Sequence, residues 1–274
     1  MSDAVRPFVV VPCLDEERAI GSLLEGVLAH CRDVIVIDDG SRDGTAEIAS
    51  RMPVTLIRHP ERRGKGEALR AGFREALKRG ASGVLTMDGD GQHDPADIPR
   101  MLDAVHRFPD AMIVGARMLE RDRQPGARRY ANDFADWGIS WGCGRPIADT
   151  QSGQRWYPRA AVELAELHAQ DFVFEAAILV AASRNLDMPV VSIPIACRYD
   201  SGARHSHFRP LRDVLRITWY TLRRVLHYGH IVQSYRASHG SPPCIYDPDA
   251  RLGASALTPV DHINPPPSAQ GRTR

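Results

Sequence analysis

The chain is most informative where it reads Val84-Leu85-Thr86-Met87-Asp88-Gly89-Asp90-Gly91-Gln92-His93. Its first four residues are mostly apolar and stop abruptly at two carboxylates, which predicts a short buried strand from Val84 to Met87. Ligands of open α/β sheets bind beyond the carboxyl ends of the strands, where Asp88 and Asp90 would lie. Mg²⁺ binds one or two carboxylates and completes its shell with waters and substrate phosphates. The stretch therefore indicates a metal that holds a diphosphate, although an acidic turn uses the same residue types.

Short apolar runs alternate with segments of helical periodicity on both sides of this stretch. The sequence predicts strands at residues 7–11, 34–37, 54–57, 84–87, 111–115 and 190–195. It predicts helices at residues 19–30, 67–79, 99–108, 130–141, 172–182 and 211–228, with a further short helix capped by Asp43 or Ser41. Strands that alternate with helices of this length form βαβ units. The predicted fold class is therefore α/β, with a mostly parallel sheet flanked by helices.

Three of the predicted strands end in acidic loops. Glu16 follows the first strand, Asp38 and Asp39 end the second, and Asp88 and Asp90 follow the fourth. Because parallel strands end at a common edge, these carboxylates would lie together and suit a nucleotide site with a metal.

Two common nucleotide-binding motifs do not fit this sequence. The first predicted strand is followed by Pro12-Cys13-Leu14, not by the G-x-G-x-x-G of a Rossmann dehydrogenase. The Gly64-Lys65-Gly66 segment is too short for a Walker P-loop and has no serine or threonine after its lysine.

Composition narrows the functional classes. The 274 residues carry a formal net charge of +1, which argues against a general nucleic-acid-binding protein. The five cysteines are scattered without metal-site spacing, and we expect reduced thiols. We find neither a signal-peptide pattern nor an apolar run of membrane-spanning length, and we expect a cytoplasmic protein.

Basic residues gather in the second half of the chain. Residues 117–129 carry five arginines, and the segment from Arg198 to Arg236 carries eight arginines against two aspartates. The predicted helix 211–228 is amphipathic and contains a tryptophan, as is typical of helices on anionic membranes. A helix packed on the domain is an equally good interpretation. The stretch from residue 237 onward is rich in proline, glycine and serine and is predicted to be disordered.

Six segments occur in a characteristic order: Val9–Glu16 (V-V-V-P-C-L-D-E), Val36–Thr45 (V-I-D-D-G-S-R-D-G-T), Gly64–Gly72 (G-K-G-x-A-x-x-x-G), Asp88–His93 (D-G-D-G-Q-H), Asp149–Gly153 (D-T-Q-S-G) and Glu175. Together they resemble the family 2 glycosyltransferases with the Rossmann-like GT-A fold, most closely the dolichol-phosphate mannose synthase-like branch. Asp15 stands where that branch usually has asparagine. The resemblance implies a GT-A domain over residues 1–209, followed by a basic amphipathic segment at 210–236 and a disordered tail at 237–274.

The resemblance also implies roles for individual residues. The residues expected to bind the nucleotide sugar are Pro12, Leu14, Glu16, Ile37, Asp38, Asp39, Lys65, Asp88 and Gly89. Asp90 and Gln92 would hold Mg²⁺ or Mn²⁺ on the diphosphate of a UDP- or GDP-linked sugar. The residues expected to meet nucleotide or acceptor phosphates are Arg117, Arg198, Arg204 and His207, the last in place of the family's usual lysine.

The implied reaction is a single displacement with inversion at the anomeric carbon, with Asp88, Arg117 and Asp149 as the catalytic residues. A polyprenyl-phosphate-type lipid acceptor needs no strong base, so Asp149 would orient arginines or the sugar. A hydroxyl acceptor on a glycolipid or small molecule would need Asp149, or second Asp171, as a general base. A non-catalytic nucleotide-sugar-binding module is a third hypothesis. With a lipid acceptor, we expect a peripheral protein at the inner face of the membrane; the oligomeric state stays open.

Overall fold

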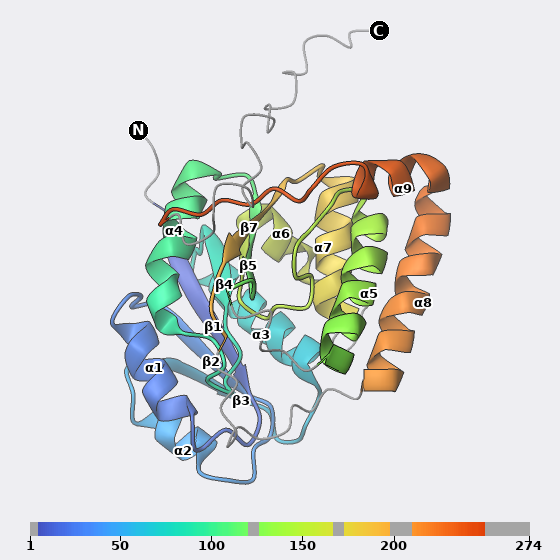
Figure 1. Cartoon of the computed structure of the whole chain (residues 1–274). Helices are drawn as coiled ribbons and strands as arrows, with labels where there is room; N and C mark the ends of the chain where they lie inside the picture. The colour runs from blue at the N-terminus through green and yellow to red at the C-terminus, as the bar shows by residue number, and fades with distance from the viewer. Residues whose placement is uncertain (1–4, 120–125, 167–172, 198–209, 250–274) are drawn as a thin grey trace, which may run out of the picture.

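The computed structural model describes residues 5–119, 126–166, 173–197 and 210–249. A single mixed sheet lies at the centre of this part of the chain, with strand order β3-β2-β1-β4-β6-β5-β7 (Figure 1). Its strands are β1 (Pro7–Cys13), β2 (Val34–Asp38), β3 (Thr55–Arg58), β4 (Gly83–Thr86), β5 (Met112–Ala116), β6 (Arg155–Pro158) and β7 (Val190–Pro194). Only β6 runs antiparallel to its neighbours within the described sheet. The predicted mostly parallel sheet is confirmed.

β6 has no counterpart among the predicted strands. It begins with Arg155, and a charged residue normally argues against a buried strand. Arg155 is nevertheless buried, because its guanidinium donates to the carbonyl oxygens of Thr150 (2.6 Å) and Ser152 (2.7 Å). Because these hydrogen bonds satisfy the buried guanidinium, Arg155 can lie in a buried strand. The sequence of such a strand lacks the apolar pattern that would reveal it.

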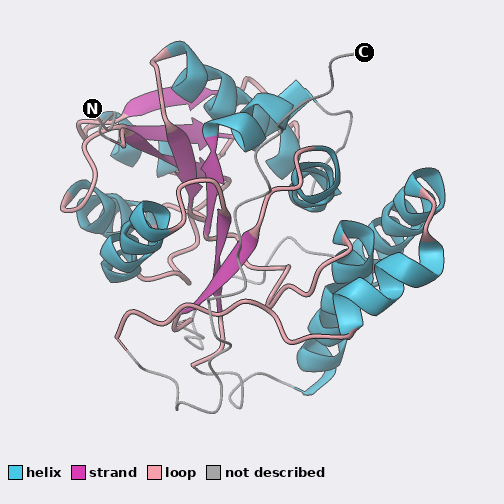
Figure 2. Ribbon diagram, turned by 90° about the horizontal axis from the view of Figure 1, so that it is seen from above, coloured by secondary structure: helices cyan, strands magenta, loops and turns pink. Residues whose placement is uncertain are grey.

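Helices cover both faces of the sheet (Figures 1 and 2). The α-helices are α1 (Ile20–Leu28), α2 (Thr45–Ser50), α3 (Lys65–Lys78), α4 (Ile98–Arg107), α5 (Gly126–Cys143), α6 (Arg159–Val162), α7 (Val173–Asn185), α8 (Pro210–Tyr228) and α9 (Ile231–His239). One hydrophobic core lies between the sheet and α1, α2 and α4, and a second lies between the sheet and α3, α6 and α7. The helices α5, α8 and α9 form a further layer outside α7.

The outer layer explains the composition of α7. Every residue from Phe174 to Ser183 is buried, so α7 has no solvent-facing stripe. A helix that is apolar all round must be covered on all sides. The sheet covers the inner side of α7, and α5 and α8 pack against it from outside.

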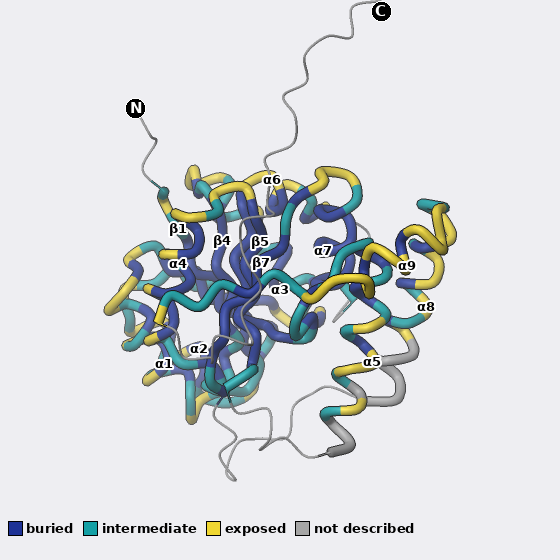
Figure 3. Tube along the Cα trace, turned by 45° about the horizontal axis from the view of Figure 1, so that its top comes forward, coloured by how far each residue is buried: buried dark blue, intermediate teal, exposed yellow. Residues whose placement is uncertain are grey.

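The predicted helix 211–228 presents two apolar faces, not one. Ile217 and Val225 are buried against the domain, whereas Trp219, Leu222 and Leu226 are exposed. The outer layer also carries exposed aromatic side chains on α5 and α9, and Figure 3 shows the contrast with the buried sheet. Within the described residues, no helix is both long and apolar enough to cross a membrane.

The prediction of a disordered tail from residue 237 is wrong for residues 237–249. The helix α9 extends to His239, and the following segment crosses back over the sheet, where Ile245 bridges Ser192 of β7. Arg100 of α4 anchors this segment through ion pairs with Asp247 and Asp249 (3.1 and 2.5 Å). The sequence pattern does not reveal such long-range pairs. The rest of the predicted tail lies outside the described residues.

Candidate active site

The carboxyl ends of β1, β2 and β4 meet at one edge, because these strands are parallel neighbours. The predicted clustering of three acidic loops is therefore confirmed. Pro12 and Ile37 are paired buried residues at the ends of β1 and β2, and Leu14 and Glu16 lie half-buried in the loop after β1.

The backbone conformation at Asp15 explains why this loop tolerates an aspartate in place of asparagine. Its φ of +56° lies in the left-handed region, which asparagine and aspartate adopt more readily than other side-chain-bearing residues. Its carboxylate accepts a hydrogen bond from the backbone N–H of Arg42 (2.8 Å), and its own N–H donates to Ser41 (2.8 Å). The turn after β1 is thereby tied to the loop after β2.

Asp38 and Asp39 hold neighbouring loops in place. Asp38 accepts the N–H of Ser41 (2.9 Å) and pairs with Arg58 (3.0 Å). Asp39 lies 2.8 Å from the His59 ring nitrogen and accepts two backbone N–H groups of the basic loop, those of residues 63 and 64, at 2.9 and 2.8 Å. Both carboxylates are buried, so they position the loops that surround the expected nucleoside pocket.

Lys65, Asp88 and Glu175 form what we call the Lys65 cluster. The Lys65 ammonium lies 2.7 Å from an Asp88 oxygen and 3.0 Å from a Glu175 oxygen. Lys65 opens α3, Asp88 follows β4 and Glu175 lies in the first turn of α7, so three elements converge here. Burial favours a neutral lysine, but the two carboxylates outweigh it and hold the pKa of Lys65 above its ordinary value. Burial likewise favours a neutral Asp88, yet Lys65 outweighs it and lowers the pKa of Asp88.

Gly153 packs closely against the Asp88 carboxylate. A Cβ at Gly153 would lie 2.2 Å from an Asp88 oxygen, so any other residue there would displace this carboxylate. The Thr86 hydroxyl donates to the Gly153 carbonyl (2.8 Å) and holds the 149–153 segment against β4. Gly89 is similarly confined, because a Cβ there would lie 2.8 Å from that of Cys13.

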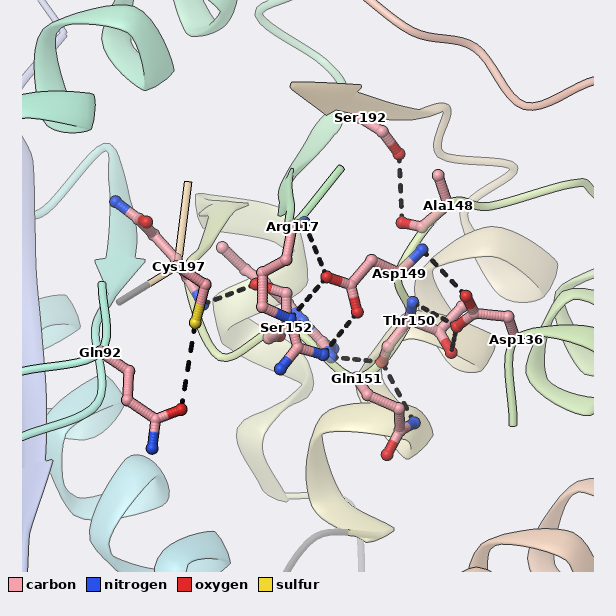
Figure 4. A network of polar contacts seen from close by, with 12 residues as sticks. Gln92, Arg117, Asp136, Ala148, Asp149, Thr150, Gln151, Ser152, Ser192 and Cys197 are labelled. Atoms are coloured by element: carbon pink, nitrogen blue, oxygen red, sulfur yellow. Dashed lines mark hydrogen bonds and ion pairs between the residues drawn. The ribbon is translucent and has the colours of Figure 1, made fainter. Parts of the chain in front are cut away.

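Arg117, Asp149 and Asp136 form what we call the Arg117 cluster (Figure 4). The Arg117 guanidinium donates from Nε and Nη2 to the two oxygens of Asp149, each at 2.7 Å, and the Arg117 backbone N–H also donates to Asp149 (2.8 Å). Asp136 of α5 accepts the backbone N–H groups of Asp149 (3.1 Å) and Thr150 (2.6 Å). Burial would raise the pKa of Asp149, but Arg117 outweighs it and lowers that pKa. Burial, and then the charge of Asp149, raise the pKa of Asp136 to about 7.

His93 is buried near charged groups of both clusters. Burial lowers the pKa of His93 to about 4, with Arg117 and Lys65 acting in the same direction and Asp88 and Asp149 opposing. The ring is therefore neutral near pH 7. Its Nδ1 has no hydrogen-bond partner among the described residues.

The predicted metal ligands lie together in the loop after β4. An Asp90 oxygen accepts the backbone N–H of Gln92 (3.0 Å), and the Gln92 side-chain oxygen lies 4.0 Å from the Cys197 sulfur. Within the part of the chain that the structure describes, no three His, Cys, Asp or Glu side chains form a metal site by themselves. An aspartate and an amide are nevertheless hard oxygen donors, which fit Mg²⁺ or Mn²⁺ when substrate phosphates supply further ligands.

A cavity of about 480 Å³ lies beside the Arg117 cluster. Arg117, Asp149 and Asp136 form one wall, and Trp137 of α5 and His239 of α9 lie in the remaining lining. Figure 4 shows Gln92 and Cys197 on one side of Arg117, with Asp149 and Asp136 on the other. The Arg117 cluster therefore lines this cavity, and the charge of Arg117 also acts on Asp88 in the loop after β4.

The structure brings together most of the predicted site residues, with two qualifications. Arg198, Arg204, His207 and Asp171 lie outside the described residues. Asp136 was not predicted, because a single aspartate in a helix carries no signal until its partners 13 and 14 residues away are known.

Comparison with known proteins identifies the family. The model of glycosyl transferase family 2 matches residues 8–158, more than half of the chain. Polyprenol monophosphomannose synthase of Mycolicibacterium smegmatis is 30% identical over 204 residues, which are 69% of this chain and 76% of that protein. The UDP-N-acetylglucosamine–dolichyl-phosphate N-acetylglucosaminyltransferase of Methanococcus voltae is 25% identical over 215 residues, which are 70% of this chain and 85% of that protein.

A solved structure shares the fold. Glucosyl-3-phosphoglycerate synthase from Mycobacterium tuberculosis, in complex with Mn²⁺, UDP and phosphoglyceric acid, matches with a TM-score of 0.62 and 20% identity, covering 82% of this chain and 78% of that one. The chain thus has the GT-A fold. It belongs to glycosyl transferase family 2, and the predicted resemblance to that family is confirmed.

Proposed function

We propose that this protein transfers a sugar from a nucleotide diphosphate sugar to a polyprenyl-phosphate-type lipid, with inversion at the anomeric carbon. The observation that carries the proposal is that the Arg117–Asp149 pair lines the cavity, while the charge of Arg117 also acts on Asp88 in the loop after β4. A guanidinium there can receive the phosphate of an acceptor next to the diphosphate of the donor. The names of the two relatives above, which denote transfer of mannose or N-acetylglucosamine to polyprenyl-type lipids, support this acceptor class.

Asp90 and Gln92 would hold a divalent cation on the donor diphosphate. The bound cation would neutralise negative charge on the leaving nucleoside diphosphate. The related fold solved with Mn²⁺ and UDP supports this assignment. A panel of UDP- and GDP-linked sugars distinguishes the two nucleotides.

On the donor side, Asp88 would accept hydrogen bonds from sugar hydroxyls. Its carboxylate is held by Lys65 and confined by Gly153, and its lowered pKa keeps it an acceptor near pH 7. Leu14 and Glu16, in the loop after β1, would contact the nucleoside. In this proposal Asp38 and Asp39 hold the surrounding loops.

On the acceptor side, Asp149 would orient Arg117 and would not take a proton. Arg117 occupies both Asp149 oxygens and lowers the pKa of that carboxyl, which makes Asp149 a weak base. A phosphate acceptor already carries the nucleophilic charge, so a weak base is sufficient. Transfer to a hydroxyl group is the second candidate, because Asp133, Asp136 and Trp137 line the cavity and such side chains bind sugars.

The outer helical layer would contact the lipid surface. Its exposed apolar side chains are Tyr130, Phe134 and Trp137 on α5, Trp219, Leu222 and Leu226 on α8, and Ile231, Val232 and Tyr235 on α9. Exposed arginines accompany them at Arg216 and Arg223. Aromatic and basic residues on the same helices suit an anionic membrane interface. We therefore propose peripheral membrane contact; the cytoplasmic location stays a prediction.

A donor panel tests the proposal. UDP- and GDP-sugars are offered with Mn²⁺, with and without polyprenyl phosphate, and released nucleoside diphosphate is measured. We expect release that requires both the metal and the lipid phosphate. Metal-dependent release with a sugar or glycolipid acceptor, and no response to polyprenyl phosphate, would establish the second candidate. Tight nucleotide-sugar binding without any transfer would indicate a non-catalytic binding module.

A further inference from the structure

Asp136 holds the corner of chain from which Asp149 reaches Arg117. One Asp136 oxygen accepts the backbone N–H of Asp149 (3.1 Å). The other accepts both the backbone N–H and the hydroxyl of Thr150, each at 2.6 Å. A single carboxylate on α5 thus satisfies three donors on two consecutive residues of a loop (Figure 4).

The corner needs this support because its backbone is strained. Asp149 has φ of +52°, in the left-handed region, which costs an L-residue roughly 1–2 kcal/mol. From that conformation both Asp149 oxygens reach Arg117, and a second contact joins Asp149 to the Arg117 backbone. If the two N–H groups lost their acceptor, Asp149 could relax toward an ordinary backbone conformation and release the guanidinium.

We propose that Asp136 is a positioning residue that, through Asp149, sets the orientation of Arg117 toward the acceptor phosphate. The inference rests on the proposed function, since it takes Arg117 to bind that phosphate. Asp136 contacts Asp149 and Thr150, not the guanidinium itself, so its effect on the acceptor is indirect.

The chain offers a matched control at the other end of the sheet edge. Asp43 makes the same type of contact, because its carboxylate accepts the backbone N–H and hydroxyl of Thr45 and a further backbone N–H from Glu17. Asp43 lies in the loop after β2. Among the described residues, its hydrogen bonds join it to Thr45 and Glu17 and not to the Arg117 cluster. Asp43→Asn therefore removes an equivalent carboxylate without touching the corner.

The test uses the full chain with Asp136→Asn and Asp43→Asn. Steady-state kinetics give KM for polyprenyl phosphate and for the donor. Hydrogen exchange of the Arg117 Nε–H, assigned by its loss in Arg117→Lys, reports the Arg117–Asp149 contact without reference to activity. For Asp136→Asn we expect about a tenfold rise in acceptor KM, a donor KM within about twofold, and at least about tenfold faster Nε–H exchange. Asp43→Asn should leave both the acceptor KM and the exchange rate unchanged.

A folded Asp136→Asn variant with wild-type exchange at Arg117 and a wild-type acceptor KM would overturn the inference. If Asp136→Asn does not fold, Thr150→Val carries the test. It removes the hydroxyl contact to Asp136 and should shift both readouts in the same direction by a smaller factor; no shift would overturn the inference. Faster exchange in a protein that ignores polyprenyl phosphate would instead refute the proposed acceptor and leave the positioning contact supported.

Discussion

The Lys65 cluster and the Arg117 cluster are both built from one cation and two carboxylates, but the arrangements differ. In the first, both carboxylates contact the Lys65 ammonium directly. In the second, Asp149 is the carboxylate that contacts Arg117, and Asp136 supports Asp149 through its backbone. The first arrangement keeps Asp88 charged and fixed, and the second fixes the direction of a guanidinium. From this difference we infer that the two clusters divide the work: the Lys65 cluster serves the donor and the Arg117 cluster serves the acceptor.

The largest effect is expected at the metal loop. Asp90→Asn removes a charged ligand from the proposed diphosphate site, so we expect metal-dependent turnover to fall about a thousandfold. Thermal unfolding should move little, because Asp90 is only partly buried in a loop. The measurement is nucleoside diphosphate release in Mn²⁺. Turnover close to that of the wild type would show that Asp90 does not hold a metal needed for the donor reaction.

Breaking the Lys65 cluster should destabilise the fold. Lys65→Met leaves Asp88 and Glu175 without the cation between them, which costs about 3 kcal/mol of unfolding free energy. The chain's other lysine, Lys78, is exposed at the end of the same helix, and Lys78→Met should change stability by less than about 0.5 kcal/mol.

Denaturant unfolding compares the two lysine variants, and a double variant sharpens the test. Adding Glu175→Gln to Lys65→Met should recover part of the loss, because one uncompensated carboxylate is removed. Equal effects of the two lysine substitutions would show that the cluster contributes no special stability.

The sequence predicted one region of this molecule much better than the other. The half from β1 to β4 was foreseen because its strands are apolar runs and its acidic loops follow them directly. β6 and α9 were missed, since the buried Arg155 is satisfied by backbone carbonyls and the segment after α9 is held by Arg100. The site shows the same difference. Motifs contained in one loop could be recognised in the sequence, whereas Asp136 lies in α5 and contacts the separate loop at Asp149 and Thr150.

The outer helical layer can be tested separately from the chemistry. Arg216 and Arg223 are exposed on α8, and each should contribute about 1 kcal/mol to binding of an anionic surface. Replacing both with glutamine should weaken sedimentation with phosphatidylglycerol vesicles by roughly tenfold or more. Arg32→Gln with Arg107→Gln, two exposed arginines outside that layer, is the matched control. Equal binding by both double variants would make α8 an ordinary packing helix.

The smallest expected effect is a pH dependence of stability. The pKa of Asp136 is raised to about 7 in the folded protein, above the unfolded value of about 4. The folded state therefore binds more protons between these values, and the stability that Asp136 contributes falls as pH rises through 7. Asp136→Asn cannot titrate, so its Tm relative to the wild type should rise by about 3 °C from pH 6 to pH 8. A constant difference in Tm would contradict this titration.

Two-substrate steady-state kinetics of Asp88→Asn and Arg117→Lys test the central claim most directly. The claim is that the Lys65 cluster serves the donor and the Arg117 cluster serves the acceptor. It predicts a crossed pattern: Asp88→Asn raises KM for the nucleotide sugar and spares KM for polyprenyl phosphate, and Arg117→Lys does the reverse. Both variants raising the same KM, or each raising both equally, would contradict the division of work between the two clusters.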